Sequence, residues 1–121
     1  MYQVVITESI CILNCGGIKI VINEEMKSVI ENLAFLTIVT MCPDGSPHPI
    51  IVGGGTVEGD NVSVGVYAMK VTLENIKKND CAMLLAAQKF EGGAKGCRFT
   101  GNAKVIDGKF VFTATKAESL I

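Results

Sequence analysis

Lys70 and Thr72 lie where a short apolar strand gives way to a helix, and together they could hold an anion. The preceding residues, Val62–Ala68, are rich in β-branched and aromatic side chains, whereas Leu73–Lys78 has helical spacing and ends in two lysines. Thr72 is predicted to be the N-cap of that helix, whose free amide groups and dipole attract negative charge. The pattern indicates either a phosphate pocket or a capped surface helix with a solvated lysine.

No other set of residues suggests a catalytic or metal site. His48 is the only histidine, stands between two prolines near a turn, and is expected to be a surface residue. The five cysteines are expected to be reduced thiols in core positions rather than disulfides: Cys11, Cys15, Cys42, Cys81 and Cys97. The loosely spaced first pair has no second pair that would complete a zinc site, so no metal is expected.

The composition favours a single domain that associates with a second copy of itself. The 121 residues are 49% hydrophobic and 19% charged, with a mean hydropathy of +0.41. A domain this small has little interior for so much apolar surface, so we expect a homodimer. The net charge of −1 and the lack of Trp argue against a nucleic-acid partner. Polar residues interrupt the apolar Met1–Ile22 stretch below membrane-spanning length, so we expect no membrane contact and a cytoplasmic location.

The remaining elements are predicted to be mostly strands. Asn23 is expected to cap a helix with an apolar stripe from Met26 to Leu33. Strands are predicted over Phe35–Met41, His48–Val52, Val62–Ala68, Cys81–Gln88, Arg98–Ile106 and Lys109–Thr115. Turns are expected at Pro43–Ser46 and Asp107–Gly108, and a loop over Lys89–Gly96.

This succession predicts a mainly β fold, a six-stranded antiparallel barrel with two short helices. Residues 23–121 are expected to form that domain. Residues 1–22 are predicted to be an N-terminal β prelude of unclear role, with short strands at Met1–Ile6 and Ile18–Ile22.

The order of these elements resembles the FMN-binding split barrel of the pyridoxamine 5′-phosphate oxidase-like superfamily, particularly its small bacterial FMN-binding members. The residues that carry the likeness are FLTIVTMCPDGSPHPIIV, DNVSVGVYAMKVTLENIKKND, FTGNAKVI and VFTATKAESLI. The resemblance spans Met26–Ile121 and implies a six-stranded antiparallel split β-barrel with Greek-key connectivity. It also implies that FMN binds at the interface of a homodimer.

The resemblance further implies which residues contact FMN. The ring would lie along one strand and against a second wall, and the phosphate would be held at the start of the second helix. The residues in that order are Pro49, Ile50, Ile51 and Val52; Val66, Tyr67 and Ala68; and Met69, Lys70, Thr72 and Asn75. Because the first group is apolar, backbone groups are expected to bond the polar edge of the ring.

The leading hypothesis is a flavoprotein that uses FMN to transfer electrons or to reduce a small substrate, with a small molecule or a redox protein as electron partner. The alternative is a non-enzymatic ligand-binding or sensing module that holds haem, through His48, or another flavin-like ligand. Pyridoxamine phosphate oxidation itself is not expected, because the chain lacks basic clusters for a second phosphate ligand.

Overall fold

The computed structural model describes residues 20–120. These residues form two helices and seven strands, which confirms the mainly β class. The elements are α1 (Glu24–Asn32), β1 (Phe35–Met41), β2 (Pro47–Gly53), β3 (Thr56–Glu58), β4 (Asn61–Gly65), α2 (Lys70–Lys78), β5 (Cys81–Phe90), β6 (Gly93–Ile106) and β7 (Lys109–Ser119).

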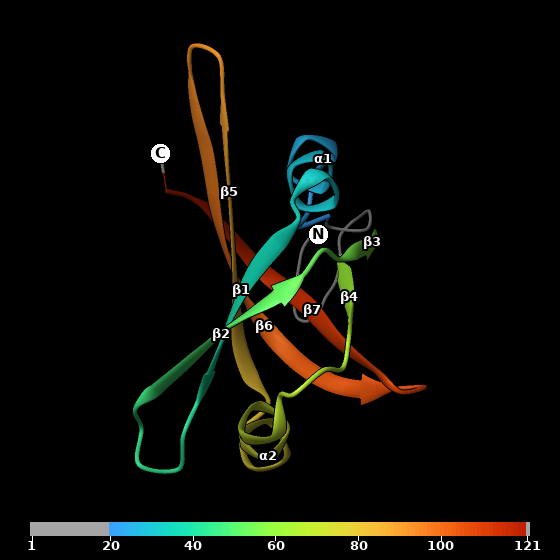
Figure 1. Ribbon diagram of the computed structural model, residues 1–121, viewed down its shortest axis with the longest axis vertical. Helices are drawn as coiled ribbons and strands as arrows, with labels where there is room; N and C mark the ends of the chain where they lie inside the picture. Colours follow the sequence, from blue (N-terminus) through green and yellow to red (C-terminus); the bar gives the residue numbers. More distant parts are fainter. Residues whose placement is uncertain (1–19, 121) are drawn as a thin grey trace, which may run out of the picture.

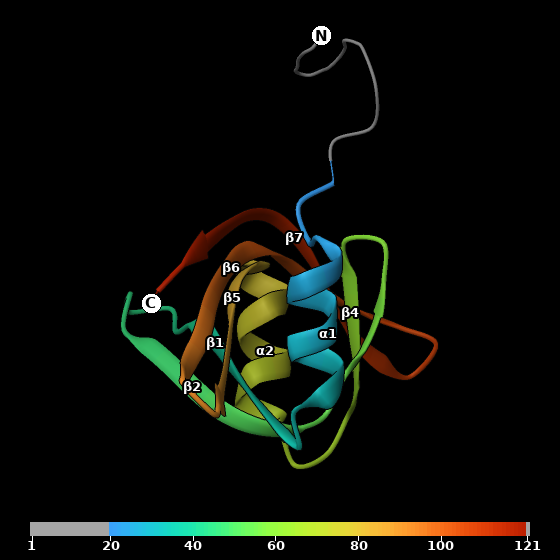
Figure 2. The ribbon, with the colours of Figure 1, turned by 90° about the horizontal axis from the view of Figure 1, so that it is seen from above.

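All seven strands belong to one antiparallel sheet in the order β2-β1-β5-β6-β7-β4-β3. Seen along its long axis, the sheet curves around both helices (Figure 2). The prediction of six strands is wrong, because the three residues of β3 pair with β4 in a segment where no strand was predicted. Strand pairing does not close the sheet into a barrel among the described residues, since β2 and β3 remain as edges.

The prediction of a loop over Lys89–Gly96 is also wrong. β5 runs to Phe90, β6 starts at Gly93, and Gly92 makes the turn between them with a φ of +92°. This turn is possible because glycine adopts positive φ without steric cost. The two strands therefore form a long hairpin that projects from the body of the protein (Figure 1).

Ile20–Ile22, the described part of a predicted strand, is not a strand. The Asp60 carboxylate holds this segment in place: the backbone N–H groups of Val21 and Ile22 both donate to Asp60 Oδ1 at 2.9 Å. The other predicted strand of the N-terminal prelude, Met1–Ile6, lies outside the described residues.

Two local predictions are confirmed. Asn23 caps α1, its Oδ1 accepting from the Met26 amide at 2.8 Å, and Glu24 and Glu25 occupy the first turn. Asp107–Gly108 forms the tight turn between β6 and β7, with φ angles of +51° and +77°. Both are interactions between near neighbours, so the local sequence is enough to specify them.

One hydrophobic core lies within the curve of the sheet and includes residues of both helices. Along the long axis of the protein, α1 lies on the side of the β5–β6 hairpin and α2 toward the opposite end (Figure 1). The largest fully buried apolar side chains are Phe99, Phe110, Phe112, Ile30, Leu36, Ile38 and Leu84. No helix in the described range is long and apolar enough to cross a membrane.

The described cysteines are free thiols, as expected, but only one of them is a core residue. Cys97 is buried, Cys42 is half-buried and Cys81 is exposed. The prediction that the thiols fill core positions is therefore wrong for Cys81, which is the first residue of β5. Cys11 and Cys15 lie outside the described residues.

We expect Gly101→Ala to be severely destabilising. A Cβ at this position would lie 1.9 Å from the backbone oxygen of Thr113, next to an irregularity in the β6–β7 pairing. β7 cannot easily move away from β6, because on its other side the Ala114 amide donates to the Asp60 carbonyl at 2.8 Å. The free energy of unfolding should fall by about 3 kcal/mol or more, as measured by urea denaturation.

Gly93→Ala is the matched control. A Cβ there meets nothing closer than the Phe90 ring at 3.8 Å, so its effect should stay within about 0.5 kcal/mol. Equal losses for the two variants would contradict the packing of β7 on Gly101.

Candidate functional site

The start of α2 has the features of an anion site, although the helix begins earlier than predicted. Lys70 is its first residue and Met69 its N-cap, and the cap makes no side-chain hydrogen bond. The Leu73 amide donates to the Met69 carbonyl at 2.9 Å, which closes the first turn. The predicted N-cap, Thr72, is therefore wrong, because this residue is the third of the helix. The first turn holds no acidic residue, and the exposed Lys70 adds positive charge to the free amides and the helix dipole.

Thr72 is fully buried, and its hydroxyl has no hydrogen-bond partner among the described residues. Leaving such a group unsatisfied costs about 1–3 kcal/mol. Side chains in a helix point back toward its N-terminus, so this hydroxyl lies on the side of the first turn. The site thus fits an anionic oxygen chemically, but contact with the hydroxyl requires neighbouring groups to shift, because its oxygen has no exposed surface.

The segment before α2 is bent and exposes an aromatic ring. Ala68 has a φ of +42°, in the left-handed region that residues with a Cβ disfavour by roughly 1–2 kcal/mol. Tyr67 is 81% exposed, and its ring lies so close to Gly65 that a Cβ there would be 2.6 Å from it. The predicted strand Val62–Ala68 accordingly ends at Gly65. The bend turns the chain from β4 into the helix.

Asn75 connects α2 to the sheet. It is 3% exposed, and its Nδ2 donates to Thr40 Oγ1 on β1 at 3.1 Å and lies 3.7 Å from Cys42 Sγ. Asn75 was predicted to contact the ligand, but its amide group is engaged with β1. The role of Thr40 was not predicted from the sequence. The only indication was that this polar residue lies within the mostly apolar run Phe35–Met41.

β2 is an edge strand with free backbone groups. The Cys42 amide donates to the Ser46 carbonyl at 2.8 Å, so these two residues form a hydrogen-bonded pair. In an antiparallel ladder, hydrogen-bonded and non-hydrogen-bonded pairs alternate. His48 and every second residue after it therefore bond to β1. The N–H and C=O of Ile51 therefore point away from β1 toward the open edge. Pro47 and Pro49, which lack an N–H, occupy outward-pointing positions of the same kind, where no ladder bond is lost.

The predicted ring-contacting residues of β2 divide between two faces. Val52 is buried in the core and Ile50 packs against it, whereas Pro49 and Ile51 lie on the opposite, exposed face. Among the other predicted residues, Met69 is a core residue, Val66 packs against the core, and Ala68 is exposed. The side chains predicted to contact FMN therefore do not all face one cavity.

The start of α2 lies near the β1–β2 pair. Asn75 follows Lys70 by five residues, or about 7.5 Å along the helix, and bonds Thr40, whose partner on β2 is His48. His48 is half-buried. Within residues 20–120, no three His, Cys, Asp or Glu side chains are grouped as a metal ion would require.

Asp44, Glu118 and Cys97 have a shifted pKa. Hydrogen bonds from the Ser46 side chain and backbone lower the pKa of Asp44, and the Arg98 guanidinium, 2.9 Å from the carboxylate, lowers that of Glu118. Burial raises the pKa of the Cys97 thiol and makes it a poor nucleophile.

Comparison with solved structures agrees on the fold. A variant of HupZ from Group A Streptococcus superposes with a TM-score of 0.69 at 18% identity, covering 82% of this chain and 99% of that chain. An FMN-binding protein from Syntrophomonas wolfei gives 0.67 at 11% identity, covering 78% and 83%. The FAD binding protein from Mycobacterium smegmatis gives 0.65 at 17% identity, covering 82% and 93%.

This chain has the fold of the FMN-binding split-barrel proteins. No protein-family model matches its sequence, and no curated protein matches it either. The split-barrel fold thus confirms the resemblance seen in the sequence at the level of architecture, while the identities are too low to carry a function with them.

Thr72→Val should stabilise the flavin-free protein. The substitution keeps the shape of the side chain and removes the buried hydroxyl that has no partner, so we expect a gain of about 1 kcal/mol. Thr72→Ser, which keeps the hydroxyl and loses the methyl group, is the control and should lower stability. Urea denaturation measures both, and a loss of stability in Thr72→Val would show that the hydroxyl is satisfied.

Proposed function

We propose that this protein binds FMN and acts in electron transfer or in the flavin-dependent reduction of a small substrate. The single observation that carries the proposal is the first turn of α2, which begins with Lys70, has no side-chain cap and no acidic residue, and contains the buried Thr72 hydroxyl, a group with no partner among the described residues. Flavin-binding proteins recur among the structures with this fold, including FMN- and FAD-binding proteins and an F420 reductase.

In this proposal the FMN phosphate binds the amides of the first turn and Lys70, and the Thr72 hydroxyl donates to it after a local shift. An anion at this position is favoured by the helix dipole and by charge-assisted hydrogen bonds. The Ile51 N–H and C=O, on the free side of β2, supply one donor and one acceptor for the polar side of the flavin ring. Backbone groups take this role because the neighbouring side chains of β2 are apolar. The exposed Tyr67 ring offers an aromatic wall.

The bound flavin would supply the redox chemistry, and the chain would supply anchoring and orientation. The electron partner is proposed to be a small molecule or a redox protein. A cytoplasmic location belongs to the same proposal and is supported by the free thiols of Cys42, Cys81 and Cys97.

The phosphate anchor is tested by comparing FMN with riboflavin, which has the same ring and no phosphate. Lys70→Ala should weaken FMN binding roughly tenfold to a hundredfold and leave riboflavin binding nearly unchanged, because it removes one charge-assisted contact. Thr72→Val should also weaken FMN binding, although it stabilises the flavin-free protein. Titrations followed by flavin fluorescence measure both affinities.

Lys78→Ala is the matched control, since this lysine lies in the last turn of the same helix. It should bind both ligands as the wild type does. If Lys70→Ala weakens FMN and riboflavin equally, the phosphate is bound elsewhere. A Soret band instead of flavin absorption in the purified protein would exclude the proposal and favour haem.

We further propose that the protein is a homodimer associating through the outer face of β2, β1 and β5. The register places a row of apolar and small side chains on this face, and Phe35 and Ile51 are 68% and 66% exposed. The residues of the row are Phe35, Thr37, Val39, Ile51, Met83 and Leu85. Exposed apolar surface of this kind is typical of association between subunits.

Ile51→Asp should convert the dimer to a monomer, because it places a charge in this apolar face at one of its most exposed side chains. Light scattering during size exclusion gives the mass directly. Ile106→Asp is the control, since Ile106 is 43% exposed but lies beside the β6–β7 turn. If the wild type is already a monomer at micromolar concentration, the proposal fails.

A further inference from the structure

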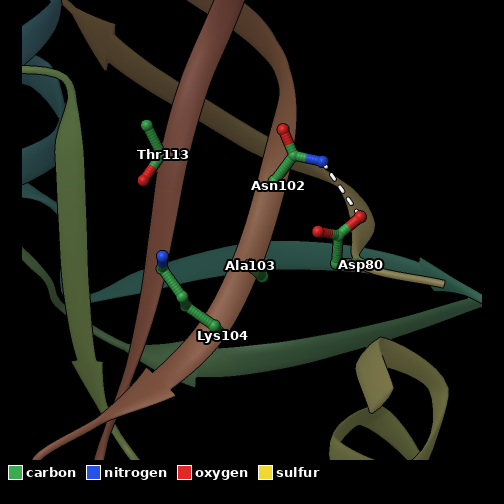
Figure 3. A pocket seen from close by; sticks show the side chains of 5 residues that line it. All are labelled: Asp80, Asn102, Ala103, Lys104 and Thr113. Atoms are coloured by element: carbon green, nitrogen blue, oxygen red, sulfur yellow. Dashed lines mark hydrogen bonds between the residues drawn. The ribbon is translucent and has the colours of Figure 1, made fainter. Parts of the chain in front are cut away.

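Two hollows lie on either side of the end of β6. A groove of about 510 Å³ runs between β6 and α2, and its lining comes from both elements and from the residue before β5: Leu73, Ile76, Lys77, Asp80, Ala103, Lys104 and Val105. A second hollow of about 310 Å³ is lined by Asp80, Asn102, Ala103, Lys104 and Thr113 (Figure 3). Because the two share residues of β6, they meet along the same short stretch of this strand.

This stretch of β6 is an open edge of the sheet. β5 starts at Cys81, opposite Asn102, and the last bond on this side runs from the Ala103 amide to the Asp80 carbonyl at 2.8 Å. β6 continues to Ile106, and no described strand lies beside these last residues in place of β5. The edge exists because β6 extends further than its neighbour.

The N–H and C=O of Val105 point toward the open side. Ile106 and Lys109 flank the two-residue turn between β6 and β7 and form its closing hydrogen-bonded pair. Bonded and non-bonded pairs alternate along an antiparallel ladder, so Val105 and its partner Phe110 form a non-bonded pair. Among residues 20–120, the two backbone groups of Val105 therefore have no partner. They are the donor and the acceptor that an added antiparallel strand would use.

The side of the edge that faces α2 is apolar. Side chains alternate along a strand, so Val105 shares one face of β6 with Ala103, which is a core residue. Leu73 is half-buried and Val105 is 48% exposed, so both present apolar atoms to the groove. Lys77 and Asp80 also line the groove and carry opposite charges, so the groove favours an uncharged, apolar group.

The other side of the edge is polar. The Lys104 side chain extends toward Thr113 on β7, and Asn102 Nδ2 donates to Asp80 Oδ1 at 3.1 Å (Figure 3). One lysine and one aspartate give this hollow no net charge. A strand added at the edge therefore fits when its side chains alternate, with an apolar one toward α2 and polar ones toward this hollow.

We propose that the open edge of β6 binds an extended peptide segment of a partner protein as an added antiparallel strand. The central residue of the segment pairs with Val105, donating its N–H to the Val105 C=O and accepting from the Val105 N–H. Residues directly opposite each other point to the same face, so an aliphatic central side chain enters the groove beside Leu73. The residues before and after it are polar and face the second hollow.

This mode of binding divides affinity and specificity between two kinds of contact. Main-chain hydrogen bonds give affinity, and pockets for alternate side chains give specificity. A second copy of this chain is a poor donor of the segment, because the edge strands of its sheet are β2, with two prolines, and β3, with three residues. The inference uses none of the groups assigned to FMN and does not depend on the proposed function.

Titration of ¹⁵N-labelled full-length protein with the acetylated and amidated pentapeptide Ser-Thr-Val-Thr-Ser tests the proposal. Amide shifts should saturate and concentrate at Leu73–Lys77 and Ala103–Ile106. The same peptide methylated on the valine nitrogen lacks the donor and should bind about threefold to tenfold more weakly. Replacing its valine by glycine should weaken binding about tenfold, because the apolar side chain is lost. Equal binding of the three peptides, or shifts elsewhere only, would overturn the proposal.

Variants separate the backbone edge from the apolar groove. Val105→Pro removes the donor and spares the β6–β7 bonds, because this N–H points away from β7, so peptide binding should weaken about threefold to tenfold. Val105→Thr keeps the N–H and the branched shape and should stay within about twofold of the wild type. Leu73→Asp should abolish binding by placing a charge in the groove. Val71→Asp is its control, an exposed position of the same helix outside the groove, and should bind as the wild type does.

Thermal unfolding of each variant shows whether it is folded. A folded Val105→Pro protein with the peptide affinity of the wild type would contradict the assignment of the edge. If this variant does not fold, the comparison of the valine and N-methylvaline peptides on the wild type decides. A wild-type dimer that covers the edge and leaves the peptide unbound, as shown by light scattering during size exclusion, would also overturn the proposal.

Discussion

The buried hydrogen bond from Asn75 Nδ2 to Thr40 Oγ1 determines where α2 lies on the sheet. Both residues are almost completely buried, so separating them would leave two polar groups without water or a partner. An apolar contact between helix and strand tolerates sliding, whereas a hydrogen bond between two side chains does not. The placement of α2 against β1 follows from this bond, and with it the position of the proposed phosphate site at the start of the helix.

The two ends of α2 have different chemical environments. The first turn combines free amides, Lys70 and no acid, which suits an anion held by the helix itself. Further along the helix, Leu73, Ile76 and Lys77 line a groove of about 510 Å³ that is also lined by residues of β6. The helix has nine residues and is about 13 Å long, so these two environments lie close together on one short element.

The openness of the sheet has functional consequences as well. Edge strands expose backbone groups that can pair with other molecules. On β2, prolines occupy two of the outward positions, which removes donors there and leaves the Ile51 N–H as a donor on that edge. At β6, the end of β5 exposes Val105 beside an apolar groove. Strand lengths and proline positions thus select which parts of the sheet are open to ligands.

The sequence by itself determined the local structure: the Asn23 cap of α1, the Asp107–Gly108 turn and most strands of the mainly β fold. These features depend on residues that are close together in the chain, so the order of the side chains is enough to predict them. The resemblance to the split barrel also led to the correct mainly β class with two helices, including the strand-turn-helix segment at Lys70.

Only the tertiary structure decided the rest. The N-cap of α2 is Met69 rather than Thr72, because the chain turns into the helix at Ala68 in a left-handed conformation, which alanine seldom adopts and which no sequence pattern predicts. Thr72 and Asn75, both expected to contact ligand, are buried by packing against distant strands. β3 and the groove beside β6 likewise arise from pairing between segments far apart in the chain, and the free energy of such contacts depends on partners that the local sequence does not identify.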